Sequence, residues 1–548
     1  MGQVSNGKGL LLLAALIAAL ALVPLVAVVS SLLSGGSETL THIAQTVLPT
    51  YALNSALLAG LTALIAALLG VGSAWLIASC AFRGRGVWSW LLVLPIAAPG
   101  YIIAYLYTDL LTFSGPIQSA LRESFGWGAS DYWFPEVRSL PGAALMLGLV
   151  LYPYVYLLAR ASFSSQSRSQ FLAARTLGQN PRQAFFSVAL PAARPAIFGG
   201  VALVMMETLA DFGVAEYFAI PTFSTGIFRT WFALGDRQGA MQLASVMLLF
   251  VIVLVTWEAA TRRGRVATND RISDGPRPFK LDPQHTVLAN IGCALPVLFG
   301  FVIPLGMLAS NILSQADAQP FADVAASLTA SLSTALITAA IASLLAIVLV
   351  YAARQRASNT IGATPMILRV ATLGYALPGA LLAVGVLGPL AGFDLQLTRF
   401  LRDQAGWSGG LILTGTSAVL IYALTLRFLT ISYNSASAGM AKIPPSLDAA
   451  ARSLGAGPWA LLRRVHVPLL SPQLAAGAAL VFVDVMRELP ATLILRPFNF
   501  ETLATRVYRL ASDERIVEAS TSALLIVLVG LLPVIVLSRE PSQTKREG

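Results

Sequence analysis

LAARTLGQNPRQAFFSVALP, at residues 172–191, recurs as AAARSLGAGPWALLRRVHVP at residues 449–468. Gly178 and Gly455 lie 277 positions apart. The same offset relates three further pairs, which are Arg175 and Arg452, Pro181 and Pro458, and Pro191 and Pro468. Gly tolerates the left-handed conformation that ends a helix, and Pro suits the first position of the next one. Each stretch therefore predicts a polar helix-turn-helix hairpin in a chain that is otherwise apolar.

The spacing within both stretches resembles the EAA loop of binding-protein-dependent ABC importer permeases. That motif is Glu-Ala-Ala, three residues, Gly, nine residues, a branched apolar residue, one residue and Leu-Pro. The residues that fit it are Ala173, Ala174, Gly178, Val188, Leu190 and Pro191, and then Ala450, Ala451, Gly455, Val465, Val467 and Pro468. The initial Glu is absent, because Leu172 and Ala449 stand in its place and Asp448 comes one position early. The resemblance implies two ATPase-docking loops, within residues 164–194 and 433–471.

The composition is that of a polytopic membrane protein. Of 548 residues, 56% are hydrophobic and only 11% are charged, which is too apolar for a soluble protein. The formal net charge of +10 could indicate nucleic-acid binding, but no basic face with interleaved aromatic residues occurs. Basic loops on the cytoplasmic side of a membrane explain the charge better, so we expect membrane lipid and no nucleic acid as a partner.

Few residues suit a disulfide, a metal site or nucleotide binding. Cys80 and Cys293 both lie in apolar segments, and the three histidines share no spacing. An N-terminal match to a phosphate-binding loop ends in Gly9 where Ser or Thr is required, and a membrane helix follows it. We therefore expect this chain to bind no cofactor and no stable metal, and to catalyse nothing itself. If ATP drives the protein, a separate subunit binds the ATP.

About twelve apolar segments approach the length of about 20 residues that crosses a bilayer. They lie near residues 10–33, 52–79, 88–108, 140–159, 195–219, 240–257, 287–313, 329–353, 370–390, 409–426, 472–495 and 519–538. A polar segment rich in Pro, Gly and charge separates the two sets of six. We predict a first six-helix unit at 1–262, a cytoplasmic linker at 263–286 and a second unit at 287–548.

The basic residues predict the orientation. With the N-terminus in the cytoplasm, the cytoplasmic segments hold 24 Lys and Arg residues and the opposite side holds nine. This excess places both termini, both hairpins and the linker inside, and Trp127 and Trp407 in outer loops.

Further matches extend the repeat beyond the hairpins. Asn54-Ser55 matches Ser333-Thr334 at an offset of 279, and so does Pro99-Gly100 with Pro378-Gly379. Thr225 and Thr502, like Arg229 and Arg506, lie 277 apart. The chain therefore predicts an all-α membrane protein that is a fused pseudo-dimer of two six-helix units, related by an axis along the membrane normal.

Charged residues occur inside only two of the predicted spans, the fifth of each half. Glu207 and Asp211 in the first match Asp484 and Glu488 in the second, again at an offset of 277. Each pair has the i, i+4 spacing of one helix face, and Gly213 and Pro490 predict a bend or an end there. A charge at membrane depth usually faces a pathway or a partner, because its insertion costs about 2.5–3.5 kcal/mol.

Two interpretations of this acidic quartet stay open. In one, the four carboxylates pair with Arg487, Arg496 or neighbouring polar groups and hold helices together. In the other, they face a central pathway from both halves and offer transient oxygen contacts to a cation.

The stretches TLADFG (residues 208–213) and RELPATLILRP (487–497) resemble the ferric-iron branch of these type I ABC importer permeases. The resemblance implies a permease of the bacterial inner membrane that imports ferric iron. Its partners would be a periplasmic ferric-iron-binding protein and two copies of an ATPase subunit, which bind ATP and Mg. The alternatives are a permease for thiamine, a phosphonate or a polyamine, an ion-coupled secondary transporter, and a structural membrane scaffold.

Overall fold

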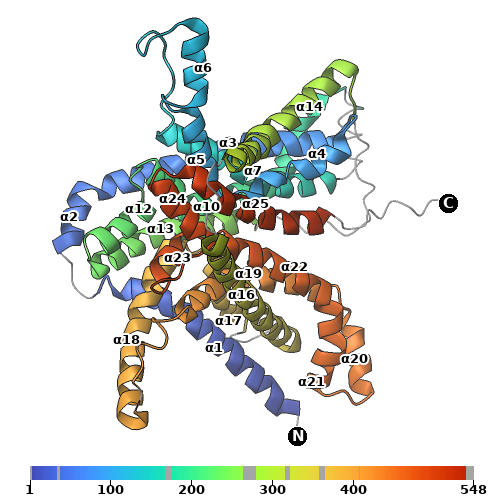
Figure 1. The fold of residues 1–548 in the computed structure, drawn as a ribbon. Helices are drawn as coiled ribbons and strands as arrows, with labels where there is room; N and C mark the ends of the chain where they lie inside the picture. Colours follow the sequence, from blue (N-terminus) through green and yellow to red (C-terminus); the bar gives the residue numbers. More distant parts are fainter. Residues whose placement is uncertain are drawn as a thin grey trace.

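The computed structural model is a bundle of helices (Figure 1). It describes residues 3–33, 38–166, 176, 178–179, 181–262, 279–314, 321–356, 364–406 and 408–538. One pair of short strands in these residues, β1 (Cys80–Ala81) and β2 (Phe279–Lys280), is parallel. The all-helical prediction is confirmed. The predicted linker lies mostly outside the described residues, as do Ala173, Ala174 and Trp407.

The helices of each half follow in chain order, where η denotes a 3-10 helix or a π-helical turn. Those of the first half are α1 (Gln3–Ser30), α2 (Glu38–Thr46), α3 (Leu48–Ser79), α4 (Arg85–Leu91), η1 (Leu94–Ala97), α5 (Gly100–Leu111), α6 (Pro116–Phe125), α7 (Leu140–Ser164), α9 (Pro181–Ala184), η2 (Phe185–Ala189), α10 (Leu190–Ala210), α11 (Gly213–Tyr217), α12 (Phe223–Phe228), η3 (Arg229–Ala233) and α13 (Arg237–Arg262). Those of the second half are α14 (Pro283–Val297), η4 (Leu298–Val302), α15 (Ile303–Ser314), α16 (Phe321–Arg356), α17 (Thr364–Ala371), η5 (Gly374–Ala376), α18 (Gly379–Ala405), α19 (Ala418–Ala441), α20 (Pro445–Ser453), α21 (Pro458–Leu461), η6 (Leu462–His466), α22 (Val467–Met486), α23 (Pro490–Leu495), α24 (Leu503–Ser512) and α25 (Ile516–Ser538).

Every predicted apolar segment overlaps a helix. Among the described residues, nine helices are long and apolar enough to cross a membrane, or ten if the bent pair Arg85–Ala97 and Gly100–Phe125 is one span. The two other predicted spans correspond to the shorter apolar helix Ile516–Leu531 and to α19. The protein is therefore a multi-pass membrane protein.

The predicted span at 409–426 is misplaced, because α19 begins only at Ala418 and continues to Ala441. The buried carboxylate of Asp394, on α18, explains the late start. It accepts hydrogen bonds from the backbone N–H groups of Ile412 (3.0 Å), Leu413 (3.0 Å) and Thr414 (2.7 Å). These bonds hold the apolar segment before α19 as a loop. The later end of the helix places Arg427 inside it.

A Pro-Gly pair turns the chain at the same point of both halves. Pro99 precedes α5 with φ −60° and ψ 140°, and Pro378 precedes α18 with φ −56° and ψ 142°. A 3-10 helix comes before each Pro, η1 in the first half and η5 in the second. In the first half, the helix axis bends by 89° here. The predicted offset of 279 at this pair is confirmed.

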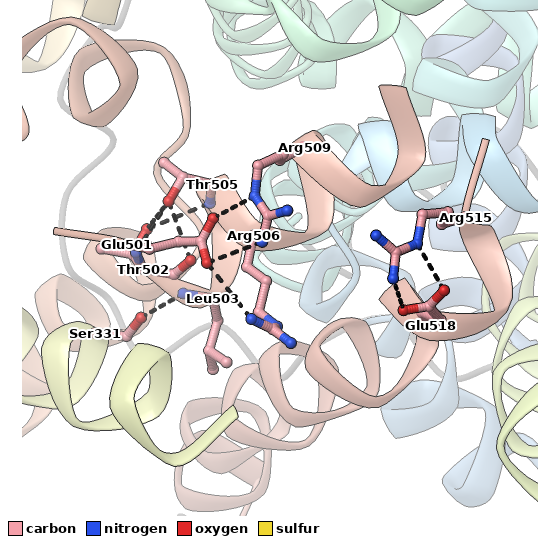
Figure 2. Close-up of polar contacts among 9 residues, drawn as sticks. All are labelled: Ser331, Glu501, Thr502, Leu503, Thr505, Arg506, Arg509, Arg515 and Glu518. Carbon is pink, nitrogen blue, oxygen red and sulfur yellow. Dashed lines mark hydrogen bonds and ion pairs between the residues drawn. The ribbon is translucent and has the colours of Figure 1, made fainter. Parts of the chain in front are cut away.

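The predicted offset of 277 is wrong beyond the fifth spans. Thr222 and Thr225 form a capping box at the start of α12, and Thr502 with Thr505 forms the same box at the start of α24 (Figure 2). These boxes are 280 residues apart. Ala219 and Asn499, which both have positive φ, lie at the same distance. The second half thus contains three additional residues before α24, which the offset of 277 did not take into account.

The offset at the second spans also differs from the predicted 279. The backbone N–H of Phe223 donates to the Ser55 hydroxyl (3.1 Å), and that of Leu503 donates to the Ser331 hydroxyl (2.7 Å; Figure 2). Ser55 and Ser331 are therefore structural counterparts, 276 positions apart. A three-residue shift is close to one helical turn, so the Ala- and Leu-rich sequence fits either register.

The two halves exchange their first helices. Helix α1 packs against α16, α17 and α18 of the second half, and α15 packs against α5 of the first (Figure 1). Hydroxyl-to-carbonyl bonds join the halves at both places, from Tyr422 to Leu20 (2.7 Å) and from Tyr107 to Phe299 (2.6 Å). The fifth spans α10 and α22 each pack against the fourth span of their own half. Their C-terminal ends meet at the centre of the molecule, where the predicted acidic residues lie.

Candidate functional site: a carboxylate-lined cavity and two hairpins

A cavity of about 120 Å³ lies between the two halves at the ends of α10 and α22. All four residues of the predicted quartet line it, namely Glu207, Asp211, Asp484 and Glu488. The structure thus brings together side chains that are up to 281 positions apart in the sequence. Within the described chain, no three or more His, Cys, Asp or Glu side chains form a group that could hold a metal ion.

The quartet does not lie on two helix faces, contrary to the i, i+4 prediction. Helix α10 ends at Ala210 and Asp211 has an extended backbone, while α22 ends at Met486, two residues before Glu488. The predicted interruption of both spans is therefore present, just before Gly213 and Pro490.

Asp211 and Glu488 each bond to the first turn of the helix that follows. Asp211 accepts from the backbone N–H groups of Val214 (3.0 Å) and Ala215 (3.3 Å). Glu488 accepts from those of Ala491 (2.9 Å) and Thr492 (2.9 Å), and from the Thr492 hydroxyl (2.8 Å). The first backbone N–H groups of a helix lack partners within the helix, and an acceptor beside them ends one helix and starts the next. This local bonding explains why the spans break here.

Two guanidinium groups pair with the acids of the second half. Arg427 donates to Glu488 (2.8 Å), and these side chains are only 10% and 2% exposed. Arg487 pairs with Asp484 and also donates to the carbonyl of Ile96 (2.8 Å) in the first half. The scaffold interpretation therefore describes the second-half acids well.

The acids of the first half have no such cations. The positions 277 residues before Arg427 and Arg487 hold Val150 and Ala210. Glu207 accepts a hydrogen bond from the Tyr375 hydroxyl (3.0 Å), and Asp211 accepts only the backbone bonds described above. In the part of the chain that the structure describes, neither carboxylate has an ion-pair partner. The cavity is consequently acidic on its first-half side.

Arg427 is the site residue that the sequence prediction missed. The misplaced span at 409–426 ended one residue before it, so it counted as a residue at a helix end. A signal was present, because Arg427 stands alone in the otherwise uncharged stretch from Ala418 to Ala441. The glycine at 379 matters here as well, because a Cβ there would lie 2.7 Å from Glu488 Oε1.

The second hairpin has the predicted geometry. Helix α20 is followed by Gly455, whose φ of +82° is left-handed. Its N–H bonds to the carbonyl of Arg452 (3.0 Å), and that of Ala456 bonds to Ala451 (3.0 Å), which together are a Schellman motif. Pro458 then opens α21. Ala450 is exposed and Ala451 half-buried on α20, so the start of the motif faces outward.

The described part of the first hairpin matches the second. Gly178 has φ +80°, and Pro181 opens α9. In both hairpins a five-residue π-helical turn then leads into the fifth span, η2 before α10 and η6 before α22, at an offset of 277. Pro191 and Pro468 are each the second residue of their span. The sequence did not predict these turns, which often mark functional segments of helices.

An ionic cluster anchors the second hairpin. Asp448 is buried and accepts from Arg354 of α16 (2.9 Å) and lies 3.0 Å from Nε2 of His466. Asp448 thus forms a salt bridge, although the next position, where the EAA motif has Glu, holds Ala449. The first half has Phe171 and Ala189 at the positions of Asp448 and His466.

Aromatic packing takes the place of this cluster in the first half. The Trp75 ring lies 4.8 Å from that of Phe185, 5.6 Å from Phe163 and 6.3 Å from Phe279, measured between centroids. Phe279 belongs to β2, so the described end of the linker also packs here. The described part of the first hairpin thus packs through aromatic rings.

We expect acid to loosen the second hairpin selectively. Burial raises the pKa of Asp448, but hydrogen bonds from Arg354 and His466 outweigh burial and hold it below the ordinary value of 3.8. A depressed pKa stabilises the fold above the unfolded-state pKa, and this contribution is lost as pH falls through the folded-state pKa. Hydrogen exchange of the second hairpin, in α20, α21 and η6, should rise below about pH 4 more than that of α9 and η2 in the first.

Asp448→Asn should produce the loose state already at neutral pH, with a loss of about 1.5–3 kcal/mol for the charged hydrogen bonds. Asp403→Asn, at an exposed carboxylate of α18, is the matched control and should leave exchange of α20 unchanged. Equal acid sensitivity of the two hairpins would contradict the assignment.

Comparison with known proteins finds the same family model in both halves of the chain. The model of the binding-protein-dependent transport system inner membrane component matches residues 69–260 and 363–539. The chain is 24% identical over 484 residues to the Fe(3+)-transport system permease protein FbpB 2 of Haemophilus influenzae, covering 86% of each chain. It is 23% identical over 473 residues to the ferric transport system permease protein FbpB 1 of the same organism, covering 83% of this chain and 71% of that one.

A shorter match involves another substrate name. The chain is 30% identical over 166 residues to the 2-aminoethylphosphonate transport system permease protein PhnV of Salmonella typhimurium, which covers 30% of this chain and 58% of that protein.

The family model matches one segment in each half of the chain, residues 69–260 and 363–539. Each of these segments contains one hairpin and one fifth span with its pair of acids. The chain belongs to the family of binding-protein-dependent transport system inner membrane components.

Proposed function

We propose that this chain is the permease of an ATP-driven importer that passes ferric iron across the inner membrane of a bacterium. The acidic cavity between the halves carries the proposal, because Glu207 and Asp211 present carboxylate oxygens that form no ion pair with a guanidinium among the described residues. Hard cations such as Fe(III) favour oxygen ligands. The names of the two Haemophilus relatives support the same substrate.

The geometry of the cavity suits passage better than storage. Its volume is about 120 Å³, and the carboxylates around it are already engaged in backbone, hydroxyl or ionic contacts. Conduction requires contacts that attract the ion but release it. The phosphonate alternative fits less well, because an acidic lining repels an anion. Alternating access of the two halves would open the cavity to each side in turn.

The substrate test is uptake into proteoliposomes that contain the permease and its ATPase. A soluble binding protein loaded with radioactive ferric iron is added outside the liposomes. ATP is enclosed inside them, on the side that the ATPase subunits face. We expect iron to accumulate only with ATP, even when proton and sodium gradients are collapsed. Uptake that follows an ion gradient without ATP would instead establish a secondary transporter, and uptake of phosphonate but not iron would overturn the substrate.

We further propose that each hairpin docks one ATPase subunit, so that two copies bind ATP and Mg while this chain binds neither. The left-handed Gly178 and Gly455 set the angle between the helices of each hairpin. Among the described residues, no atom lies within 4 Å of a Cβ built at either position, so we expect a substitution to act through backbone strain. That strain is about 1–2 kcal/mol per residue.

Gly178→Val with Gly455→Val should leave the permease in the membrane but abolish stimulation of the ATPase by the loaded binding protein. The matched control is Asn at both positions, because Asn tolerates the left-handed conformation and should retain coupling. Normal binding of the ATPase and normal transport by the Val variant would show that the hairpins are not the coupling elements.

The orientation that this proposal needs has both termini, the hairpins and the linker in the cytoplasm. We expect Gly275→Cys, in the linker, to resist an impermeant thiol reagent in intact cells, because 24 basic residues favour that side over nine. Ser130→Cys, in the exposed outer loop, should react. Labelling at 275 and not at 130 would reverse the topology.

A further inference from the structure

Helix α6 turns its apolar face away from the protein. Phe125 is 61% exposed and Ile117 is 38% exposed. With the half-buried Leu121 between them, they share one face at i, i+4 and i+8. A helix at the surface of a soluble protein normally packs its apolar face against the core, and α6 leaves this face exposed.

The polar face of α6 is satisfied from within. The Tyr132 hydroxyl donates to Gln118 Oε1 (2.7 Å), and Gln118 Nε2 donates to the carbonyl of Leu111 (2.8 Å). Arg122 donates to the Tyr132 hydroxyl (3.0 Å) and to the carbonyl of Phe113 (2.8 Å). These contacts hold the loop after α6 against its polar side. The apolar face is therefore left for something outside the chain.

Aromatic rings extend this apolar face into the loop. Phe125 stacks on Trp127 with centroids 4.6 Å apart, and Trp127 lies 5.5 Å from Tyr132. Trp133 is 85% exposed. Trp and Tyr are the residues that membranes collect at the boundary between headgroups and acyl chains.

The position of α6 fits that boundary. It precedes α7, and the first hairpin follows α7, so α6 and the hairpin lie at opposite ends of one span. The axis through Gly100–Phe125 is bent by 89° from that of Arg85–Ala97. Figure 1 shows α6 projecting away from the helix bundle beyond α5.

The second half carries a similar projection. The end of α18 leaves the bundle at a different edge from α6 (Figure 1). Phe393 is 55% exposed and Phe400 is 61% exposed. They lie seven residues, or about two helical turns, apart on α18. Asp394 points the other way, into the loop before α19. Both projections thus expose aromatic side chains, although the end of α18 also exposes Arg399 and Asp403.

Charge distinguishes a lipid surface from an acidic or basic partner. Residues 112–139 carry Arg122 and Arg138 against Glu123, Asp131 and Glu136, so the segment is close to neutral. Attraction to anionic lipid requires a basic face, whereas insertion of apolar side chains does not.

We propose that residues 112–139, which we term the aromatic arm, lie on the outer surface of the membrane with Ile117, Phe125 and Trp127 inserted between lipid headgroups. The arm continues directly from the membrane-embedded α5 through the turn at Ser114-Gly115. The occupant of its apolar face is the lipid of the outer leaflet, bound through apolar contact and not through headgroup charge. The arm thereby fixes the depth of α5, whose N-terminal Gly100 and Tyr101 line the cavity.

The test places nitroxide labels on α6 in the whole permease, held in nanodiscs of uncharged phosphatidylcholine. Ile117→Cys and Phe125→Cys are each made in a background of Cys80→Ala and Cys293→Ala, because both native thiols are buried. Glu123→Cys, exposed on the same helix, is the control. Collision rates are measured with oxygen, which concentrates in lipid, and with a water-soluble nickel chelate.

We expect oxygen to dominate at 117 and 125 and the nickel chelate to dominate at 123, with no change on raising the salt concentration. Free access of the nickel chelate to 117 and 125 would overturn the proposal. So would protection of these two positions that appears only when the soluble binding protein is added, because the arm would then be a protein-docking surface.

Discussion

Arg427→Met is expected to lower the free energy of unfolding by about 3–5 kcal/mol, the usual cost of removing one partner of a buried ion pair. The side chain of Glu488 is only 2% exposed, so water cannot replace the lost guanidinium. Its remaining bonds, to two backbone N–H groups and the Thr492 hydroxyl, do not supply a positive charge. The thermal unfolding midpoint of the purified permease in lipid nanodiscs measures the effect.

Two further variants make this prediction specific. Adding Glu488→Gln to Arg427→Met should restore most of the stability, because a neutral amide needs no counter-charge and still accepts a bond from the start of α23. Arg399→Met removes an exposed guanidinium from α18 and should change the midpoint little. A midpoint of Arg427→Met equal to that of the unmodified protein would mean that the pair contributes nothing to the fold.

Glu207→Gln with Asp211→Asn should have the largest effect on transport. The substitutions keep the shape of both side chains and remove the two carboxylates that lack a guanidinium partner among the described residues. We expect iron uptake to fall by about tenfold or more, which corresponds to only 1.4 kcal/mol of lost stabilisation. Because no ion pair is broken, the amount of inserted protein and its assembly with the ATPase should persist.

Glu123→Gln with Asp131→Asn is the matched control. It removes two carboxylate charges from exposed residues, one on α6 and one in the loop after it, and should leave uptake per inserted protein unchanged. If the Glu207 and Asp211 variant also transports in proportion to its amount, the quartet is scaffolding throughout, and the path of the ion must follow other helices.

Local chemistry explains which features the sequence could predict. Gly178, Gly455 and the Pro residues after them act within a few residues, so the hairpin turns follow directly from residue type. The break after Asp211 was likewise foreseeable from Gly213. The all-helical, two-unit architecture followed from apolar length and from the repeated motifs.

Features that depend on contacts between helices could not be predicted in this way. The start of α19 is set by Asp394, which is distant in sequence, and the late start carries Arg427 into the buried site. The registers of the second spans and of α12 and α24 differ from the motif-derived offsets by three residues. In the second spans, a periodic Ala and Leu pattern cannot distinguish these registers. The pairing of Asp448 with Arg354 joins elements 94 positions apart.

The unequal halves of the cavity have a consequence for how such a chain can evolve. If the transporter were a dimer of two identical second halves, every Asp484 and Glu488 would come with an Arg487 and an Arg427. If it were two identical first halves, no carboxylate at the positions of Glu207 and Asp211 would form an ion pair with a guanidinium. Fusion of a duplicated gene frees each copy to mutate alone, so one half can specialise in holding the core together while the other keeps carboxylates free of cations. A single substitution of Val150 or Ala210 by Arg would introduce into the first half a guanidinium of the kind that the second half has, and would reduce this difference between the halves.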